Sequence, residues 1–296
     1  MIQHPTVLVL GAGASSHLDY PMGAALKHEI ITQSAGAAAV LEKLGRSPQP
    51  LKEFCEALRL SGKQSVDSFL EHRKEFLEVG KIAIAERLIK RENQGKLFDN
   101  DGDWYGYLFR RMNSRFEEFL ANQLVILTYN YDRSLEAFLY TALTNSYKRP
   151  EEETTKALNS LVIIHLHGSL GSLPWQKTLG RHYQQNVEPQ QVALAAAGIK
   201  VVHEAAADSE EFNKARLLLS NAKRVIFAGF GYGDDNVKRL QPATTMLNKA
   251  LFVWGTAHGL MTAERQGVEQ AFGQATIRLG RKEDKILDFF RETVAL

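Results

Sequence analysis

Short apolar runs alternate along this chain with segments whose apolar residues recur at helical spacing. The runs lie at residues 6–10, 123–128, 161–166, 224–228, 251–254 and 275–279. Runs of this length, bounded by small or polar residues, are typical of buried strands. Strands that alternate with helices predict a parallel, doubly wound sheet. We therefore expect an α/β fold with a Rossmann-like sheet.

The stretch between the first two runs has a different pattern. From Met22 to Leu120 the sequence is almost continuously helical, with no convincing second strand. Helices are expected here over Met22–Leu44, Leu51–Leu60, Gln64–Asn93 and Tyr105–Leu120. Later helices are expected over Asp132–Thr144, Ser209–Asn221, Asp234–Leu247, Leu260–Phe272 and Lys282–Thr293. The pattern predicts one domain over residues 1–296 with a helical insertion at about residues 30–120.

Composition narrows the function classes only slightly. The chain has 296 residues, a net charge of +2 and one cysteine, Cys55. This charge indicates neither a nucleic-acid partner nor an anionic membrane surface. A single cysteine excludes an internal disulfide and a cysteine-based zinc site, so we expect Cys55 to pack within its helix. There is no apolar segment of about 18 residues and no basic leader, which favours a cytoplasmic protein.

The first apolar run breaks into a glycine-rich loop, Gly11-Ala12-Gly13-Ala14-Ser15. Glycines permit a tight turn and a close backbone approach to a ligand, and a following helix offers free N–H groups to a pyrophosphate. A dehydrogenase would also carry an acidic residue at the end of a second strand, about 20 residues on. That region is helical here, which argues against ordinary hydride transfer. A tight turn without a ligand is the alternative.

The other predicted strands also end in small or polar residues. The second run is followed by Thr128–Asp132, the third by His165–Ser169, the fourth by Gly229–Asp234, and the fifth by Gly255-Thr256. Because ligands of open α/β sheets bind at the carboxyl ends of the strands, these endings together predict one site.

Two of these endings carry chemistry. Asn130 has a neutral amide that can hold a ribose hydroxyl or position a water, unless it is only a turn residue. His167, beside Gly168, is the histidine expected to face the crevice, where it can accept a proton near neutral pH. His165 is expected to be packed or hydrogen-bonded in the core. No third ligand accompanies the two histidines, so no metal site is predicted.

Two acidic residues have two interpretations each. Asp132 is placed to cap the helix that follows it or to contribute to the site. Asp234 follows the turn Gly229–Gly233 and either caps the next helix or holds a ribose.

In this order, the motifs GAGAS, TYNYD, HLHGS and GFGYGDDN resemble the SIR2-like, or sirtuin-type, NAD-binding domain. They lie at Gly11–Ser15, Thr128–Asp132, His165–Ser169 and Gly229–Asn236, and Val66–Leu70 resembles a segment of the bacterial branch. The resemblance implies NAD+ as substrate, with Asn130 and His167 as the catalytic pair. It implies that the cofactor-binding residues are Gly11, Ala12, Gly13, Ser15, Asp132, Gly168, Gly229, Gly231, Asp234 and Thr256.

The chain also departs from sirtuin deacylases. It lacks their four-cysteine zinc module and the proline–acid–phenylalanine–arginine run after the first loop, where Leu18–Gly23 stands instead. It looks more like the SIR2-like NAD+ hydrolases of bacterial anti-phage systems. That likeness implies a homo-oligomer and a partner of the HerA-type ATPase class, or alternatively a short Argonaute. The other interpretations are a non-catalytic NAD- or ADP-ribose-binding scaffold, a divergent deacylase and an ADP-ribosyltransferase.

Overall fold

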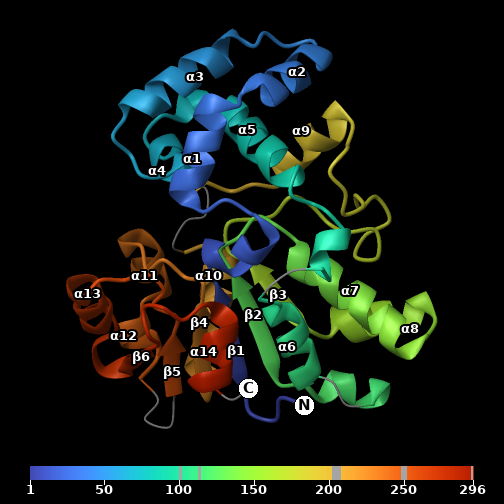
Figure 1. The fold of residues 1–296 in the computed structure, drawn as a ribbon, viewed down its shortest axis with the longest axis vertical. Helices are drawn as coiled ribbons and strands as arrows, with labels where there is room; N and C mark the ends of the chain where they lie inside the picture. Colours follow the sequence, from blue (N-terminus) through green and yellow to red (C-terminus); the bar gives the residue numbers. More distant parts are fainter. Residues whose placement is uncertain (100–101, 113–114, 202–207, 248–251, 295) are drawn as a thin grey trace.

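The computed structural model describes residues 1–99, 102–112, 115–201, 208–247, 252–294 and 296. Its centre is a six-stranded parallel sheet in the order β3-β2-β1-β4-β5-β6 (Figure 1). The strands are β1 (Thr6–Leu10), β2 (Leu124–Thr128), β3 (Val162–His165), β4 (Arg224–Ala228), β5 (Phe252–Gly255) and β6 (Ile277–Leu279). The predicted Rossmann-like sheet is therefore confirmed. Of the predicted strand residues, Leu251 lies outside the described ones.

Alternate residues of the central strand point to opposite faces of the sheet. Leu8 and Leu10 of β1 enter one hydrophobic core, and Val7 and Val9 enter the other. All four side chains are nearly inaccessible to solvent, as expected for a strand covered on both faces.

Helices cover both faces. The first core contains residues of α6 (Trp104–Met112), α7 (Ser134–Tyr147), α8 (Glu151–Asn159) and α14 (Ile286–Glu292). The second core contains residues of α10 (Glu210–Asn221), α11 (Asp234–Leu240) and α13 (Thr262–Phe272), and α12 (Pro242–Thr245) lies between the last two in the chain. The 3-10 helices near the sheet are η1 (Ala12–Leu18), η3 (Gly95–Leu97), η4 (Phe116–Ala121) and η5 (Gly273–Ala275).

A helical lobe stands above the carboxyl edge of the sheet (Figure 1). It comprises α1 (Gly23–Thr32), α2 (Ala35–Lys43), α3 (Gln49–Leu60), α4 (Val66–Leu70), η2 (Lys74–Phe76), α5 (Leu77–Ile89) and α9 (Pro189–Ala197). Among the described residues between β1 and β2 there is no further strand. The division of the chain into one domain with an insertion at about residues 30–120 stays a prediction.

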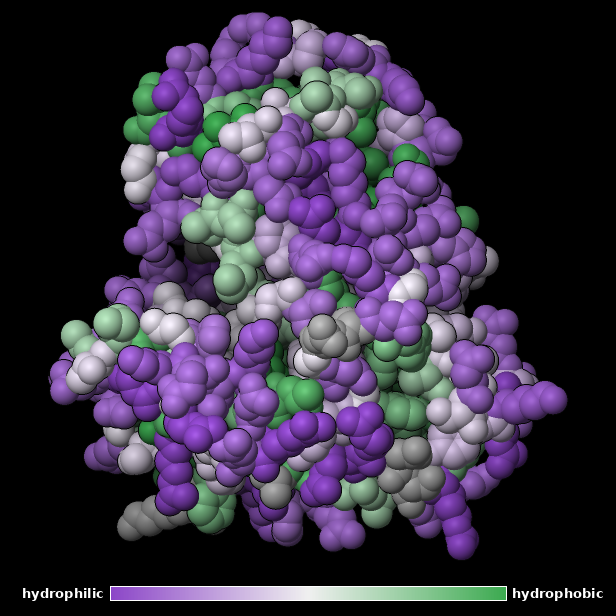
Figure 2. Space-filling view, in the orientation of Figure 1, coloured by the Kyte–Doolittle hydropathy of each residue, from purple (hydrophilic) through white to green (hydrophobic). Residues whose placement is uncertain are grey.

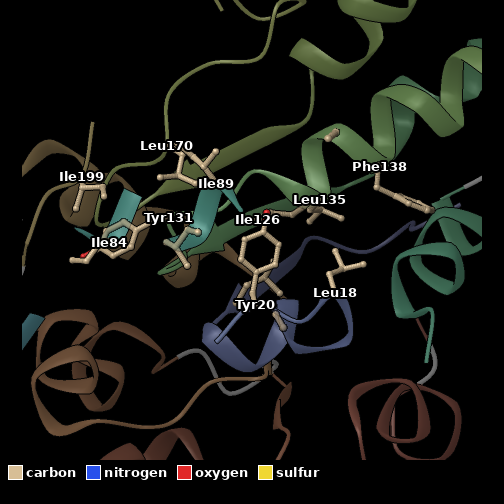
Figure 3. Close-up of a cluster of buried hydrophobic side chains, with 14 of the residues drawn as sticks. Leu18, Tyr20, Ile84, Ile89, Ile126, Tyr131, Leu135, Phe138, Leu170 and Ile199 are labelled. Carbon is tan, nitrogen blue, oxygen red and sulfur yellow. The ribbon is translucent and has the colours of Figure 1, made fainter. Parts of the chain in front are cut away.

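The lobe shares its core with the sheet. Figure 3 shows Ile84 and Ile89 of α5 gathered with Tyr20, Ile126 of β2 and Leu135 of α7. All five side chains are buried and belong to the first core.

A buried ion-pair network also connects the helical lobe to the part of the chain around the sheet. Glu92, just after α5, is fully buried and receives paired hydrogen bonds of 2.5–3.0 Å from both Arg133 and Arg181. Arg133 also donates to the carbonyls of Ser172, Arg181 and His182 at 2.8–2.9 Å. Because every charge in it has a partner, the network fixes the end of α5 to the start of α7 and to the loop before α9.

Four of the expected helices are not continuous. The segment Met22–Leu44 divides at Gln33 and Ser34 into α1 and α2. The buried positions Leu26, Ile30, Ala37 and Leu41 keep helical spacing across the break, so their periodicity conceals it.

The expected helix Gln64–Asn93 divides into α4, η2 and α5. Ser65 and Ser68 form a capping box at the start of α4, and the backbone leaves the helical region at Arg73, whose φ and ψ are −127° and 69°. The expected helix Asp234–Leu247 divides into α11 and α12 at Gln241, whose φ is +52°, followed by Pro242. The expected helix Tyr105–Leu120 is α6 followed by the 3-10 helix η4, with residues 113–114 outside the described part.

The surface in Figure 2 is mostly hydrophilic, with apolar residues in small, scattered patches. None of the helices in the described part of the chain has the length and hydropathy of a membrane span.

Candidate functional site

The five predicted strand endings lie along one edge of the sheet because all strands are parallel. In this order the sheet reverses its direction of winding between β1 and β4, the point at which such folds bind ligands. The loops after β1 and β4 therefore meet at the centre of the edge.

These two loops pack backbone against backbone. The N–H of Gly13 donates to the carbonyl of Gly229 at 2.9 Å, and the N–H of Gly11 donates to the carbonyl of Ala228 at 3.2 Å. A Cβ on Gly13 would lie 2.9 Å from the Gly229 oxygen. Gly229 has a φ of +60°, and a Cβ there would lie 2.2 Å from the nitrogen of Ala14. Only glycine at both positions allows this approach.

Beside the two loops lies a cavity of about 340 Å³. Four of the residues predicted to bind a cofactor line it: Gly13, Gly229, Gly231 and Thr256. The remaining walls include His17, Trp104 and residues 284–287 at the start of α14. This volume is within the range of small-molecule sites, which is about 300–1,000 Å³.

His17 is a cavity residue that the sequence reasoning missed. Its ring packs edge-on against Tyr105 with centroids 4.7 Å apart. Burial lowers the pKa of His17 to about 4, so the ring is neutral at neutral pH. Its position directly after the glycine loop was an available signal, whereas Trp104 and residues 284–287 are too far away in sequence for any local motif to show them.

The other side of η1 faces a buried polar cluster. Ser15 is 2% exposed; its hydroxyl donates to Asp132 at 2.7 Å and accepts from the amide of Asn130 at 3.2 Å. The structure therefore joins three predicted site residues, from the ends of β1 and β2, by direct hydrogen bonds. The Ser15 hydroxyl is engaged inside the protein, while Gly13, Ser16 and His17 face the cavity.

Asp132 lies just before α7 but is not its N-cap residue. Arg133 holds that position without a side-chain capping bond, and the Asp132 carboxylate accepts from the N–H of Ser134, the first residue of the helix, at 3.1 Å. It also belongs to the cluster through Ser15. Burial raises the pKa of Asp132, although the hydrogen bonds from Ser134 and Ser15 act in the opposite direction.

A small cavity of about 10 Å³ lies against this cluster. Its lining includes Ser15, Asn130, Asp132 and Tyr105. A space of this size, lined by both polar and apolar side chains, is about what one water needs. The cluster thus has hydrogen-bonding groups and room for about one water.

His167 lies at the end of the neighbouring strand and is 5% exposed. Its Nε2 is 3.3 Å from the amide oxygen of Asn236, and its ring lies 5.3 Å from that of Tyr129. With Nε2 as the donor, Nδ1 keeps its lone pair; this atom is buried and has no hydrogen-bond partner. Burial lowers the pKa of His167, which favours the neutral form that accepts a proton. His167 is not among the described residues that line either cavity.

Of the other residues predicted to bind a cofactor, some lie at the cavity and others lie outside its described lining. Thr256 accepts from the N–H of Gly229 at 2.9 Å and so holds the second glycine loop. Gly168 has a φ of +70° and is paired with Ile199 in an isolated bridge. Ala12 is exposed at the start of η1, and Asp234 is exposed at the first residue of α11, outside the described cavity lining.

His165 is hydrogen-bonded in the core, as predicted: Nδ1 is 2.9 Å from the carbonyl of Asn130 and Nε2 is 2.6 Å from Glu136. Cys55 is buried within α3, with its sulfur 3.7 Å from the carbonyl of Ile30. In the described part of the chain, no three His, Cys, Asp or Glu side chains are grouped so as to hold a metal ion.

Comparison with protein families shows a similarity in part of the chain. The family model described as SIR2-like domain matches residues 124–249, which include Asn130, His167 and the loop after β4. No curated protein matches the chain. The chain therefore carries a SIR2-like domain over residues 124–249, and this domain implies the use of NAD.

Proposed function

We propose that the protein hydrolyses the bond between nicotinamide and ribose in NAD+, giving nicotinamide and ADP-ribose. The observation that carries the proposal is the buried cluster of Ser15, Asn130 and Asp132 beside the glycine-lined cavity. It supplies an amide, a hydroxyl and a carboxylate at the sheet edge where a nucleotide binds in this fold. The SIR2-like match supports NAD as the ligand.

The proposed reaction needs little acid catalysis. The electron pair of the broken bond leaves with nicotinamide, which departs as a neutral pyridine. Positive charge builds on the ribose, and we assign its stabilisation to the buried carboxylate of Asp132. A water adds to the ribose carbon and loses its proton, for which the free Nδ1 of His167 is the candidate acceptor.

The roles of the individual residues belong to the same proposal. Asn130 positions the ribose or the water. Gly11, Ala12 and Gly13 serve the diphosphate. The adenosine side is assigned to Gly229, Gly231, Asp234 and Thr256, three of which line the cavity.

His167 needs one further movement in this proposal. Its ring donates to Asn236 and is not part of the described cavity lining, so it must leave that contact to reach a substrate. The same contact is the observation that favours a second candidate function, a non-catalytic module that binds NAD or ADP-ribose. Calorimetry that shows binding without turnover under every activating condition would favour this second function.

Incubation of the pure protein with NAD+, followed by measurement of nicotinamide and ADP-ribose, tests the proposal. Asn130→Ala and His167→Ala should abolish release, whereas Ser220→Ala, at an exposed serine of α10 away from the cavity, should not. If the first two variants kept the wild-type rate, the residue assignment would be wrong. Consumption of NAD+ only with an acetyl-lysine peptide would indicate a deacylase instead.

We further propose, from the resemblance alone, that NAD+ depletion serves anti-phage defence in the cytoplasm. The proposed assembly is a homo-oligomer with a HerA-type ATPase, or alternatively with a short Argonaute. Light scattering of the protein alone and co-purification with a neighbouring ATPase test these two points. A strict monomer that binds neither partner would contradict them.

A further inference from the structure

His165, the last residue of β3, contacts the main chain of Asn130. Its Nδ1 lies 2.9 Å from the main-chain carbonyl of Asn130, and its Nε2 lies 2.6 Å from Glu136 Oε1. The side chains of His165 and Glu136 are 15% and 6% exposed. One imidazole therefore joins the end of β2 to the first turn of α7.

The two partners determine the protonation of the ring. A carbonyl oxygen and a carboxylate oxygen only accept hydrogen bonds, so both ring nitrogens must donate. His165 is then an imidazolium paired with Glu136. Burial alone would lower the pKa of His165, but the charge and hydrogen bond of Glu136, followed by the contact with Asn130 and the charge of Asp132, raise it above its ordinary value.

The pair completes the immobilisation of Asn130. The N–H of Asn130 donates to the Thr128 hydroxyl at 3.0 Å, and its amide donates to Ser15 at 3.2 Å. The carbonyl is held by His165. The main-chain N–H, the main-chain carbonyl and the side-chain NH2 group of Asn130 thus each have a partner within the protein.

We propose that the His165–Glu136 pair is a positioning pair, which fixes the main chain of Asn130 and so directs its amide into the site. This inference rests on the proposed function, because it assigns a task to Asn130. Neither residue of the pair needs to contact a substrate. Misplacement of a reacting group by about 1 Å can cost on the order of a hundredfold in rate, so a rigid support has a measurable effect.

Two variants at His165 separate this role from general packing. His165→Asn places an amide N–H near the position of Nδ1, so it keeps the donor to the Asn130 carbonyl and loses the contact with Glu136. His165→Gln places its amide near Nε2, so it keeps the contact with Glu136 and loses the donor to Asn130. His28→Gln, at an exposed histidine of α1, is the control.

With NAD+ hydrolysis as the assay, His165→Gln should lower kcat by about tenfold or more with little change in KM. His165→Asn should stay within about threefold of wild type, and His28→Gln should match it. Equal losses in both His165 variants would overturn the proposal, because a packing role does not distinguish the two nitrogens.

The protonation state is measured without any turnover. In 15N spectra of histidine-labelled protein at pH 7, both nitrogens of His165 should be protonated, and Glu136→Gln should convert the ring to its neutral form. A neutral His165 in the wild type would overturn the proposed charged pair. This result depends neither on hydrolysis of NAD+ nor on the folding of the His165 variants. If the wild type releases no nicotinamide while His165 is an imidazolium, the proposed function fails and the charged pair stands.

Discussion

Ser15→Ala tests the buried cluster at the centre of the site. Ser15 is 2% exposed and links Asn130 to Asp132 through hydrogen bonds of 3.2 Å and 2.7 Å. Alanine keeps the helical turn of η1 but removes the oxygen. Both neighbours then lose a hydrogen-bond partner while they remain buried.

The expected loss of stability follows from these two bonds. A hydrogen bond to a charged group contributes about 1.5–3 kcal/mol, and one between neutral groups about 1 kcal/mol. Asp132 and Asn130 are 8% and 9% exposed, so water replaces the lost oxygen poorly. We expect the free energy of unfolding to fall by roughly 2–4 kcal/mol.

Urea unfolding at pH 7, followed by circular dichroism, measures this change. Ser16→Ala is the matched control, since Ser16 is exposed in the same 3-10 helix and its hydroxyl donates only to the Gly13 carbonyl, at 2.8 Å. It should stay within about 0.5 kcal/mol of wild type. Equal unfolding free energies for the two variants would refute the idea that buried hydrogen bonds of Ser15 hold the cluster together.

Three further changes test other parts of the structure. Gly229→Ala should destabilise the protein by more than about 2 kcal/mol in the same urea assay, because φ is +60° and the new Cβ meets backbone, whereas Gly231→Ala, which has open space, should be neutral. Glu92→Gln should lower the free energy of unfolding by roughly 3–5 kcal/mol, because it leaves the charges of buried arginines unpaired. Glu78→Gln, in an exposed ion pair, should lower it by about 0–1 kcal/mol. Similar losses in both variants would contradict the stabilising role of the network. The pKa of His17 is about 4 in the folded protein and 6.5 in the unfolded chain, so protonation favours the unfolded chain. The free energy of unfolding should therefore fall by up to roughly 3 kcal/mol as the pH falls from 7 to 4. The His17→Phe variant should lack this part of the pH dependence, and parallel curves of stability against pH for the two proteins would refute it.

The sheet was predictable because buried parallel strands have continuous apolar runs. Residues 6–10 and 224–228 coincide with β1 and β4. The common edge of the strand endings followed from the parallel arrangement. That argument predicted Asn130 and Ser15 at one site without specifying their contact.

Other features depend on residues that are distant in sequence. The pairing of Glu92 with Arg133 and Arg181 joins three segments, and no local pattern marks it. The proposed charge of His165 could not be predicted from the sequence, because it depends on the position of Glu136, which lies 29 residues away. Local periodicity also concealed the break at Gln33, because the buried positions keep helical spacing across it.

The initial rate of nicotinamide release by Asn130→Ala, relative to wild type, tests the central claim most directly. It is measured with NAD+ at saturation, with and without a co-purified partner, on samples with equal unfolding midpoints. We expect the wild type to release nicotinamide and ADP-ribose in equal amounts and the variant to release them about a hundredfold or more slowly. Equal rates for the two proteins, or no release by the wild type under any condition, would contradict it.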